Sequence, residues 1–416
     1  MKKYIFIQLI IFWSFVSAQS SSLSLNGFGE RMETFDAAST SLGDGRFFSG
    51  NLNSFSFSSP STYWKSSLAK LYTTIQISES DFGNNDNLVE NHFRMFAFMF
   101  PIGTNKACAF GMNPMYRSSL TLVEEQLHFI GADYSPTGDP LAFRTTYDFS
   151  GGISEFFTIY SMKVSERFSI GLRWSKLFGN SYYRYVLSLY DVNFNEDETI
   201  EYTGEQISFG NFKQRYSSNS YNAEIRFENT QFGLVASYYK TQKLKINLIP
   251  EYDLTGWSEE GGNDYYIESG EKHLGIGFKF KINESLGIVS EYNNLKSFNS
   301  YDFLNILDDD FPNIISHHLG LYYSVNLENK NQLVDRVNLR LGFYNKKYSM
   351  VNSDLEDQGV TLGFGLEYSD YKNTMDFCFK FGSRTSEYAT IDYENYFKFI
   401  FSISSGEAWF ERMEKE

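Results

Sequence analysis

The sequence predicts an all-β fold: a transmembrane antiparallel β-barrel of about 14 strands, preceded by an N-terminal plug segment. Three observations support this fold class. Apolar and polar side chains alternate with a period of two in one segment after another. Each segment runs about ten residues, the length that a tilted strand needs to cross the hydrocarbon layer. The connections alternate between short and long, as they do in outer-membrane barrels.

The alternation is plainest in segment 274–282, where aliphatic and aromatic residues share one parity while glycines and lysines share the other. Segments 168–175, 360–368 and 375–382 repeat it. A soluble sandwich shows similar alternation, but a polar parity rich in Gly and charge suits an enclosed lumen better than a solvent face. The chain also has 41 Phe and 30 Tyr against 7 Pro, which is the aromatic surface that a lipid-facing wall requires.

About fourteen such segments can be counted, an even number that puts both ends of the wall on the periplasmic side. The expected strands are 68–79, 91–101, 105–116, 152–164, 167–178, 218–228, 231–241, 271–282, 285–295, 314–327, 333–346, 358–369, 373–384 and 394–404. The long connections 117–151, 179–217, 242–270 and 296–313 are expected to be extracellular loops. Within the second of these, 182–193 and 201–210 alternate as well. They form either a hairpin above the membrane or two more wall strands, which would make sixteen.

The ends of the chain predict its location and its division into parts. Residues 1–18 read as a cleaved signal peptide, with Lys2 and Lys3 before an apolar run and Val16-Ser17-Ala18 at the cleavage site. The barrel is expected over 67–410, followed by a charged tail, 411–416. We therefore expect a protein of the outer membrane of a Gram-negative bacterium, in contact with membrane lipids and lipopolysaccharide. The aromatic last strand is of the kind that the barrel-assembly machinery reads during biogenesis.

The composition argues against several other classes of function. The chain has 36 Lys and Arg against 51 Asp and Glu, a net charge of −15, whereas nucleic-acid binding needs clustered positive charge. Cys108 and Cys378 lack the spacing of a metal or redox site, and the acidic runs Asp308–Asp310 and Glu259–Glu260 read as solvated loops rather than cation sites. None of the five His lies in a nucleophile motif. We expect no enzyme, no metal and no cofactor.

Residues 19–66 do not alternate like wall strands and are rich in Ser, Gly, Asn and Phe. A polar, Gly-rich segment ahead of a barrel can fold inward as a plug, or it can remain a disordered periplasmic tail. Its aromatics argue against disorder, because disordered segments are poor in them. We therefore expect a plug, or hatch, over 19–66.

Three motifs in and near this segment carry a family resemblance: Gly27-Phe28-Gly29, Ser41-Leu42-Gly43-Asp44, and Ser59-Pro60-Ser61 just before the first strand. Together with Gly151-Gly152 and Leu177-Phe178-Gly179, they resemble the FadL-like outer-membrane transporters of hydrophobic compounds. That family has Asn-Pro-Ala where this chain has Ser-Pro-Ser. The resemblance implies a fourteen-stranded barrel with a hatch in its lumen, which passes a hydrophobic small molecule sideways through a gap beside a kinked strand. A PorV-like branch of the family instead serves secretion and has a secreted-protein partner.

The resemblance implies transport of a fatty acid or hydrocarbon, and the alternatives are the PorV-like role or a general diffusion porin. An apolar ligand needs a concave, apolar lining. The candidates for that lining are Phe47, Phe48, Phe55 and Phe57. The alternative is that these side chains pack the plug against the wall. The lumen-parity cations can meet a carboxylate headgroup or pair with the lumen acids Glu224, Glu291, Glu367 and Asp376. These cations are Arg173, Lys279 and Arg340, with Lys281 and Lys380.

Overall fold

In a computed structural model of the chain, the described residues are 28–50, 56–81, 87–129, 140–194, 200–252, 263–298, 312–327, 334–349, 354–386 and 393–408. The expected signal peptide, Phe55, the two acidic runs and the charged tail lie outside these ranges. No helix among the described residues is long and apolar enough to cross a membrane.

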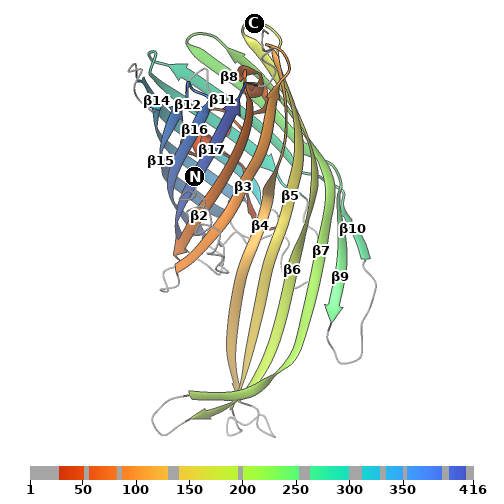
Figure 1. The fold of residues 1–416 in the computed structure, drawn as a ribbon. Coiled ribbons are helices and arrows are strands. Elements are labelled where there is room, and N and C mark those ends of the chain that lie inside the picture. Colours follow the sequence, from red (N-terminus) through yellow and green to blue (C-terminus); the bar gives the residue numbers. More distant parts are fainter. Residues whose placement is uncertain are drawn as a thin grey trace, which may run out of the picture.

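The described chain forms one antiparallel sheet of 17 strands. Three of them, β1 (Glu30–Arg31), β9 (Leu244–Tyr252) and β10 (Asn263–Ile267), are not part of the ring, and the other 14 form a closed barrel (Figure 1). β17 pairs with β2, and β8 pairs with β11. All fourteen expected strands are confirmed. The wall strands are β2 (Ala69–Asp81), β3 (Asn87–Pro101), β4 (Lys106–Phe129), β5 (Pro140–Lys163), β6 (Phe168–Phe194), β7 (Ile200–Glu228), β8 (Phe232–Thr241), β11 (Lys272–Lys281), β12 (Leu286–Lys296), β13 (Asn313–Asn326), β14 (Val334–Ser349), β15 (Asp354–Tyr368), β16 (Asn373–Ser386) and β17 (Tyr393–Glu407).

The two faces of the wall differ as the alternation predicts. On β11, Leu274, Ile276 and Phe278 point outward and are 47%, 49% and 40% exposed, while Lys279 points inward and is 2% exposed. An apolar outer face removes the cost of placing polar groups in lipid, and strand pairing satisfies most of the backbone groups of the wall. The barrel therefore belongs in an outer membrane.

Four strands continue far beyond the barrel, which corrects the prediction of long loops at 117–151 and 179–217. β4, β5, β6 and β7 stay paired well past the wall and form a tall sheet on the side of the long connections, which is the extracellular side (Figure 1). We call this sheet the extension. Pieces 182–193 and 201–210 are its β6–β7 hairpin, so the alternative of sixteen wall strands is wrong. Strand lengths were predicted from membrane thickness, which does not limit a strand outside the lipid.

A short hairpin in the predicted loop 242–270 joins the edge of the extension. β9 (Leu244–Tyr252) pairs with β7, and β10 (Asn263–Ile267) pairs with β9.

Glycines mark the level at which the extension leaves the barrel. Gly151 and Gly152 on β5 have φ of +109° and +143°, and Gly179 on β6 has +149°. A Cβ at Gly152 would stand 2.1 Å from the carbonyl oxygen of Tyr116 on β4. L-residues rarely adopt these conformations, so glycine at these positions allows the strands to bend while their pairing continues.

β3 and β4 are paired over only part of their length. Their register runs from Pro101↔Ala107 to Phe96↔Met112 and stops there, while β4 turns into the extension and β3 continues beside β2. A register shift at Met115 on the other edge of β4 accompanies the turn. In the extracellular half of the wall β3 and β4 therefore diverge and are not hydrogen-bonded to each other (Figure 1). We call this interruption of their pairing the opening.

Residues 28–50 and 56–66, here called the inner segment, are buried against the lumen face of the wall. The inner segment contains β1 (Glu30–Arg31), the short helix α2 (Ala37–Thr40) and the 3-10 helix η2 (Pro60–Lys65). Asp36 caps α2 by accepting from the Ser39 N–H at 2.6 Å. Pro60 opens η2, where its missing N–H costs no hydrogen bond.

Candidate functional site

Ion pairs tie the inner segment to strands near the end of the chain. Asp44 accepts from Lys346 and Lys380, each at 2.8 Å. Glu30 lies 2.8 Å from Arg384 and 2.5 Å from Lys398. Burial alone would raise the pKa of Asp44, but the two ammonium groups hold that pKa well below its usual range. The carboxylates of the segment thus neutralise lumen cations that would otherwise be buried unpaired.

Three more ion pairs add to these contacts, and two of them reach other parts of the wall. Arg31 lies 2.9 Å from Glu271, just before β11, and Lys65 lies 2.6 Å from Glu228 on β7. Glu33 lies 2.9 Å from Lys346. The segment is therefore fixed around much of the lumen, not at a single strand.

Ser59-Pro60-Ser61 is held by one acid and one base of β7. Ser59 and Ser61 both donate hydroxyl hydrogen bonds to Glu224. Arg226, 1% exposed, donates to the hydroxyl oxygens of Ser59 at 2.7 Å and Ser61 at 2.9 Å, and to the Phe47 carbonyl at 2.7 Å. The two hydroxyls thus link the turn before β2 to the wall.

The predicted aromatic residues lie in two separate clusters. Phe47 and Phe48 pack with Leu42, Val235, Val289 and Tyr322. Phe47 fits over two lumen glycines: a Cβ at Gly275 would stand 2.6 Å from its ring, and one at Gly277 would stand 2.8 Å away. These contacts are packing of the inner segment against the wall.

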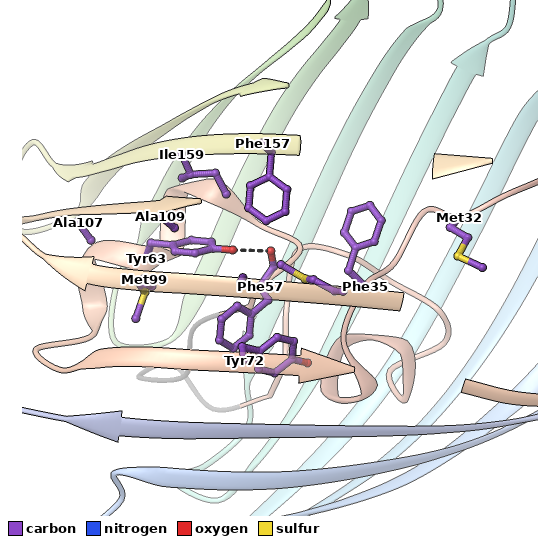
Figure 2. Packing of buried hydrophobic residues seen from close by; sticks show 12 residues of the cluster. Met32, Phe35, Phe57, Tyr63, Tyr72, Met99, Ala107, Ala109, Phe157 and Ile159 are labelled. Carbon is purple, nitrogen blue, oxygen red and sulfur yellow. Dashed lines mark hydrogen bonds between the residues drawn. The ribbon is translucent and has the colours of Figure 1, made fainter. Parts of the chain in front are cut away.

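Phe57 lies apart from that pair, in a cluster on the lumen face of β2, β3, β4 and β5. Figure 2 shows its ring beside Tyr72, with the Tyr63 hydroxyl donating to the Phe57 carbonyl. The two rings stack with centroids 3.5 Å apart, and the hydroxyl bond is 2.8 Å long. The described phenylalanines therefore do not converge on one concave lining.

The predicted lumen cations are engaged by neighbouring groups. Arg173 lies 2.5 Å from Glu155 and stands over the Phe157 ring. Arg340 lies 2.8 Å from Asp376 and also donates to the Ser49 carbonyl at 2.9 Å.

The remaining charges follow the same rule. Lys279 donates to the Gly50 carbonyl, and Glu291 accepts the backbone N–H of Arg46 at 2.8 Å and of Phe47 at 3.0 Å. Glu367 lies 3.2 Å from Arg336. These particular wall charges thus pair with other wall charges or hydrogen-bond to backbone groups of the inner segment.

The inner segment covers the opening between β3 and β4 from inside. β1 pairs with the edge of β4 that β3 leaves free, with Glu30 opposite Arg117 and Arg31 opposite Tyr116. Met32 continues the ladder by donating its N–H to the Met115 carbonyl at 2.9 Å. A row of unpaired backbone groups inside a membrane wall is costly, and β1 satisfies part of it.

Charged side chains line the same opening on the β3 side. Glu90 and His92 are in contact at 2.7 Å, and Arg117 reaches Glu90 across the opening at 3.7 Å. Arg117 is partly exposed, with 38% of its side chain accessible.

A polar cavity of about 290 Å³ lies at the opposite, periplasmic end of the inner segment. Its lining includes Asp36, Lys70, Arg340 and Tyr371.

Sequence reasoning missed the acids of the inner segment and their partners on β14, β16 and β17. The available signal was a set of acids at 30, 33 and 44 and a set of lumen-parity lysines near the chain end. Nothing in the sequence paired them, since about three hundred residues separate the two sets.

Comparisons with known proteins show the family and the fold of the chain. A family model described as BamG matches residues 1–415. Among solved structures, a Pseudomonas aeruginosa FadL homologue aligns with a TM-score of 0.53 at 12% identity, covering 94% of this chain and 99% of that one. A structure titled CymD monoaromatic hydrocarbon channel aligns with a TM-score of 0.52 at 11% identity, covering 91% and 99%. At such identities the two structures establish the shared fold. No curated protein matches the chain.

Proposed function

Because the chain belongs to the BamG family, we propose that it works with the β-barrel assembly machinery of the outer membrane and engages protein partners through its extension. The first three letters of the family name, Bam, are the abbreviation used for that machinery. The partner role of the PorV-like alternative is related, since it also needs a protein-binding surface outside the membrane.

The extension is the observation that carries this proposal. A barrel needs strands of about ten residues to cross the membrane, yet β6 and β7 have 27 and 29 residues. Aromatic pairs stiffen the paired strands above the barrel: Phe149 meets Tyr183 with centroids 5.4 Å apart, and Tyr147 meets Tyr185 at 5.3 Å. A stiff sheet held outside the membrane offers a binding surface at no further cost in chain entropy.

We further propose that residues 19–66 form a fixed plug, and the inner segment supports this proposal. Its ion pairs span β7, β11, β14, β16 and β17, so releasing it would leave several buried charges unpaired. A closed and rigid barrel is suited to anchoring a sheet. The proposal assigns the chain no catalytic step.

The test is to shorten the extension while the barrel is kept. Ser118 faces Gly151 and Ser181 faces Gln214, so a short turn can join each pair without changing wall register. Affinity purification of tagged full-length protein is expected to recover assembly-machinery subunits, and the shortened variant is expected to lose them while keeping the heat-modifiable gel migration of a folded barrel. A control variant shortens only the β9–β10 hairpin, by joining Leu248 to Asn263. Equal recovery with full and shortened extensions would refute the proposal.

A second function, passage of hydrophobic small molecules, is favoured by the opening between β3 and β4. A gap on the extracellular half of the wall, covered from inside by the inner segment, is a route by which an apolar molecule can enter or leave sideways. Phe47, Phe48 and Phe57, with Phe55, are the candidate lining if the segment shifts, and Arg173, Lys279 and Arg340 are candidates for a headgroup.

A disulfide across β1 and β4 tests this second function. Glu30 and Arg117 are register partners, within the Cα separation that a disulfide spans, so E30C/R117C in a C108S/C378A background locks the opening. Uptake of a labelled fatty acid or monoaromatic hydrocarbon should stop in the oxidised protein and return on reduction. If uptake is the same in the oxidised and the reduced protein, this route is excluded. In a second experiment, deletion of residues 19–66 should alter uptake if the segment is the gate.

A further inference from the structure

Three lysines stand in one row on the outer face of the barrel. Lys272 on β11 is the direct register partner of Lys240 on β8 and of Lys296 on β12. All three side chains are exposed. Within the part of the chain that the structure describes, none of the three lies within ion-pair distance of a carboxylate. We call them the lysine row.

Such a row is unfavourable unless an anion joins it. Residues directly opposite on antiparallel strands have Cα atoms about 5 Å apart, and like charges at that spacing repel. Other exposed lysines near this end of the barrel do have acidic partners: Lys245 lies 2.8 Å from Asp264, and Lys347 lies 2.7 Å from Asp354. The row is therefore distinct from its surroundings in having cations alone.

The row lies at the extracellular border of the apolar wall. Directly below Lys272 on β11, the outward residues from Leu274 to Ile282 are all apolar. Their span of nine residues, tilted as barrel strands are, matches an apolar band about 25 Å tall. Headgroup phosphates of the outer leaflet lie at this level, since the extension leaves the barrel on the same side.

An apolar groove of about 770 Å³ begins at the row and runs across the wall from β8 to β3. Lys240 lies at one end of it. Its floor is formed where outward side chains are small, at Cys108, Thr158 and Ala223, and larger side chains flank it: Phe100, Phe110, Tyr160, Leu172, Trp174, Tyr221 and Tyr238. A groove of this form suits a flexible hydrocarbon chain.

We propose that the lysine row binds the phosphate of an outer-leaflet glycolipid, lipopolysaccharide, and that one of its acyl chains lies in the groove below Lys240. The charge and the apolar volume fit the two ends of one molecule: an anionic headgroup at the membrane border and a chain running into the wall. The site is independent of the function proposed above and needs only the folded barrel.

The test is titration of the purified full-length protein in detergent with lipopolysaccharide, following retained lipid. K240Q/K272Q/K296Q is expected to bind roughly tenfold more weakly or worse, because each lysine near an anionic headgroup contributes a few-fold. The matched control K243Q/K245Q/K347Q removes the same charge from lysines that have acidic partners and should bind like the parent. All six residues are on the surface, and gel migration checks that each variant is folded.

Further binding measurements distinguish binding of the headgroup from binding of the acyl chain, and lipopolysaccharide from another anionic lipid. With dephosphorylated lipid A the difference between parent and triple variant should vanish. Ala223→Trp, which fills the groove, should weaken both the phosphorylated and the dephosphorylated forms. The proposal is overturned if the triple variant keeps parental affinity, if the control triple loses as much, or if phosphatidylglycerol binds equally well through the same lysines.

Discussion

Gly29 of the inner segment lies against the backbone of Arg117 on β4, so closely that a Cβ at Gly29 would stand 2.1 Å from the Arg117 carbonyl oxygen. Gly29 also has φ of +95°, which L-residues rarely adopt. Both observations explain why glycine is needed at this position. β1 can reach the free edge of β4 only if the chain turns sharply and passes close to that edge. The cover over the opening therefore begins at this glycine.

Gly29→Ala should loosen that cover without unfolding the barrel. The backbone strain and the steric clash are expected to cost about 1–3 kcal/mol. This cost should weaken the pairing of Glu30 and Arg31 with β4. Hydrogen exchange of backbone amides at 30–32 should accelerate, while amides of β11 and β12 keep their protection. Gly233→Ala is the control, since an added Cβ there meets mainly the flexible Glu228 side chain. Unchanged exchange at 30–32 would contradict this account of Gly29.

Asp44→Asn should destabilise the inner segment strongly. The change leaves Lys346 and Lys380 buried with less negative charge, and breaking a buried pair in this way costs about 3–5 kcal/mol. Trp64 in η2, in a background with the other tryptophans changed to Phe, reports on the segment by fluorescence during urea unfolding. Asp354→Asn breaks an exposed pair with Lys347 and should produce no measurable shift.

The contribution of Asp44 should also fix the acid limit of the inner segment. The pKa of Asp44 in the folded protein lies below its usual value of 3.8, so its stabilisation is complete above that value and is lost as pH falls below it. The Trp64 signal should therefore be constant from neutral pH to about pH 4 and change only below it. In Asp44→Asn this acid transition should shrink; a transition of parental size in the variant would show that other carboxylates set the limit.

The wall could be predicted from the sequence because its determinants are local. Leu274 and Lys279 each reveal their face by parity alone, and every strand repeats the same rule. The length of β6 could not be predicted this way, because strand alternation continues unchanged from lipid into water and the prediction stopped the strand at the membrane border. Gly151 and Gly152, noted only as part of a resemblance, are the residues where the wall ends and the extension begins.

The site was less predictable, since its partners are distant in sequence. Parity assigns Arg340 to the lumen and offers four lumen acids as partners, but it singles out neither Asp376 nor the Ser49 carbonyl. Asp44 meets Lys380 across 336 positions, a contact fixed by closure of the barrel and not by any local pattern.

Arg226→Lys should weaken the anchor of the turn before β2. The guanidinium of Arg226 bonds Ser59, Ser61 and the Phe47 carbonyl from one planar fork, and a single ammonium cannot reach all three. The loss is expected to be about 2 kcal/mol in urea unfolding, because each unmet buried bond costs about 1 kcal/mol or more. Arg167→Lys, at an exposed turn, is the matched control. If both lysine variants unfold at the same urea concentration, the fork is not what holds the turn.

Gly152→Ala tests whether the glycine bend orients the extension. At φ of +143° an alanine is strained, and its Cβ would collide with the Tyr116 carbonyl at 2.1 Å, so β4 and β5 must separate locally or change their bend. The wall below should survive, because pairing from Lys106 to Asn113 does not involve this residue. Spin labels at Tyr182 on the extension and at Leu319 on the lipid face of β13 report the angle between the two parts, since both side chains are exposed. The distance distribution between them is expected to shift or broaden in Gly152→Ala, and partner recovery in affinity purification should fall with it. A distribution identical to that of the parent would mean that the extension is oriented by its own strand pairing, not by the bend at Gly152.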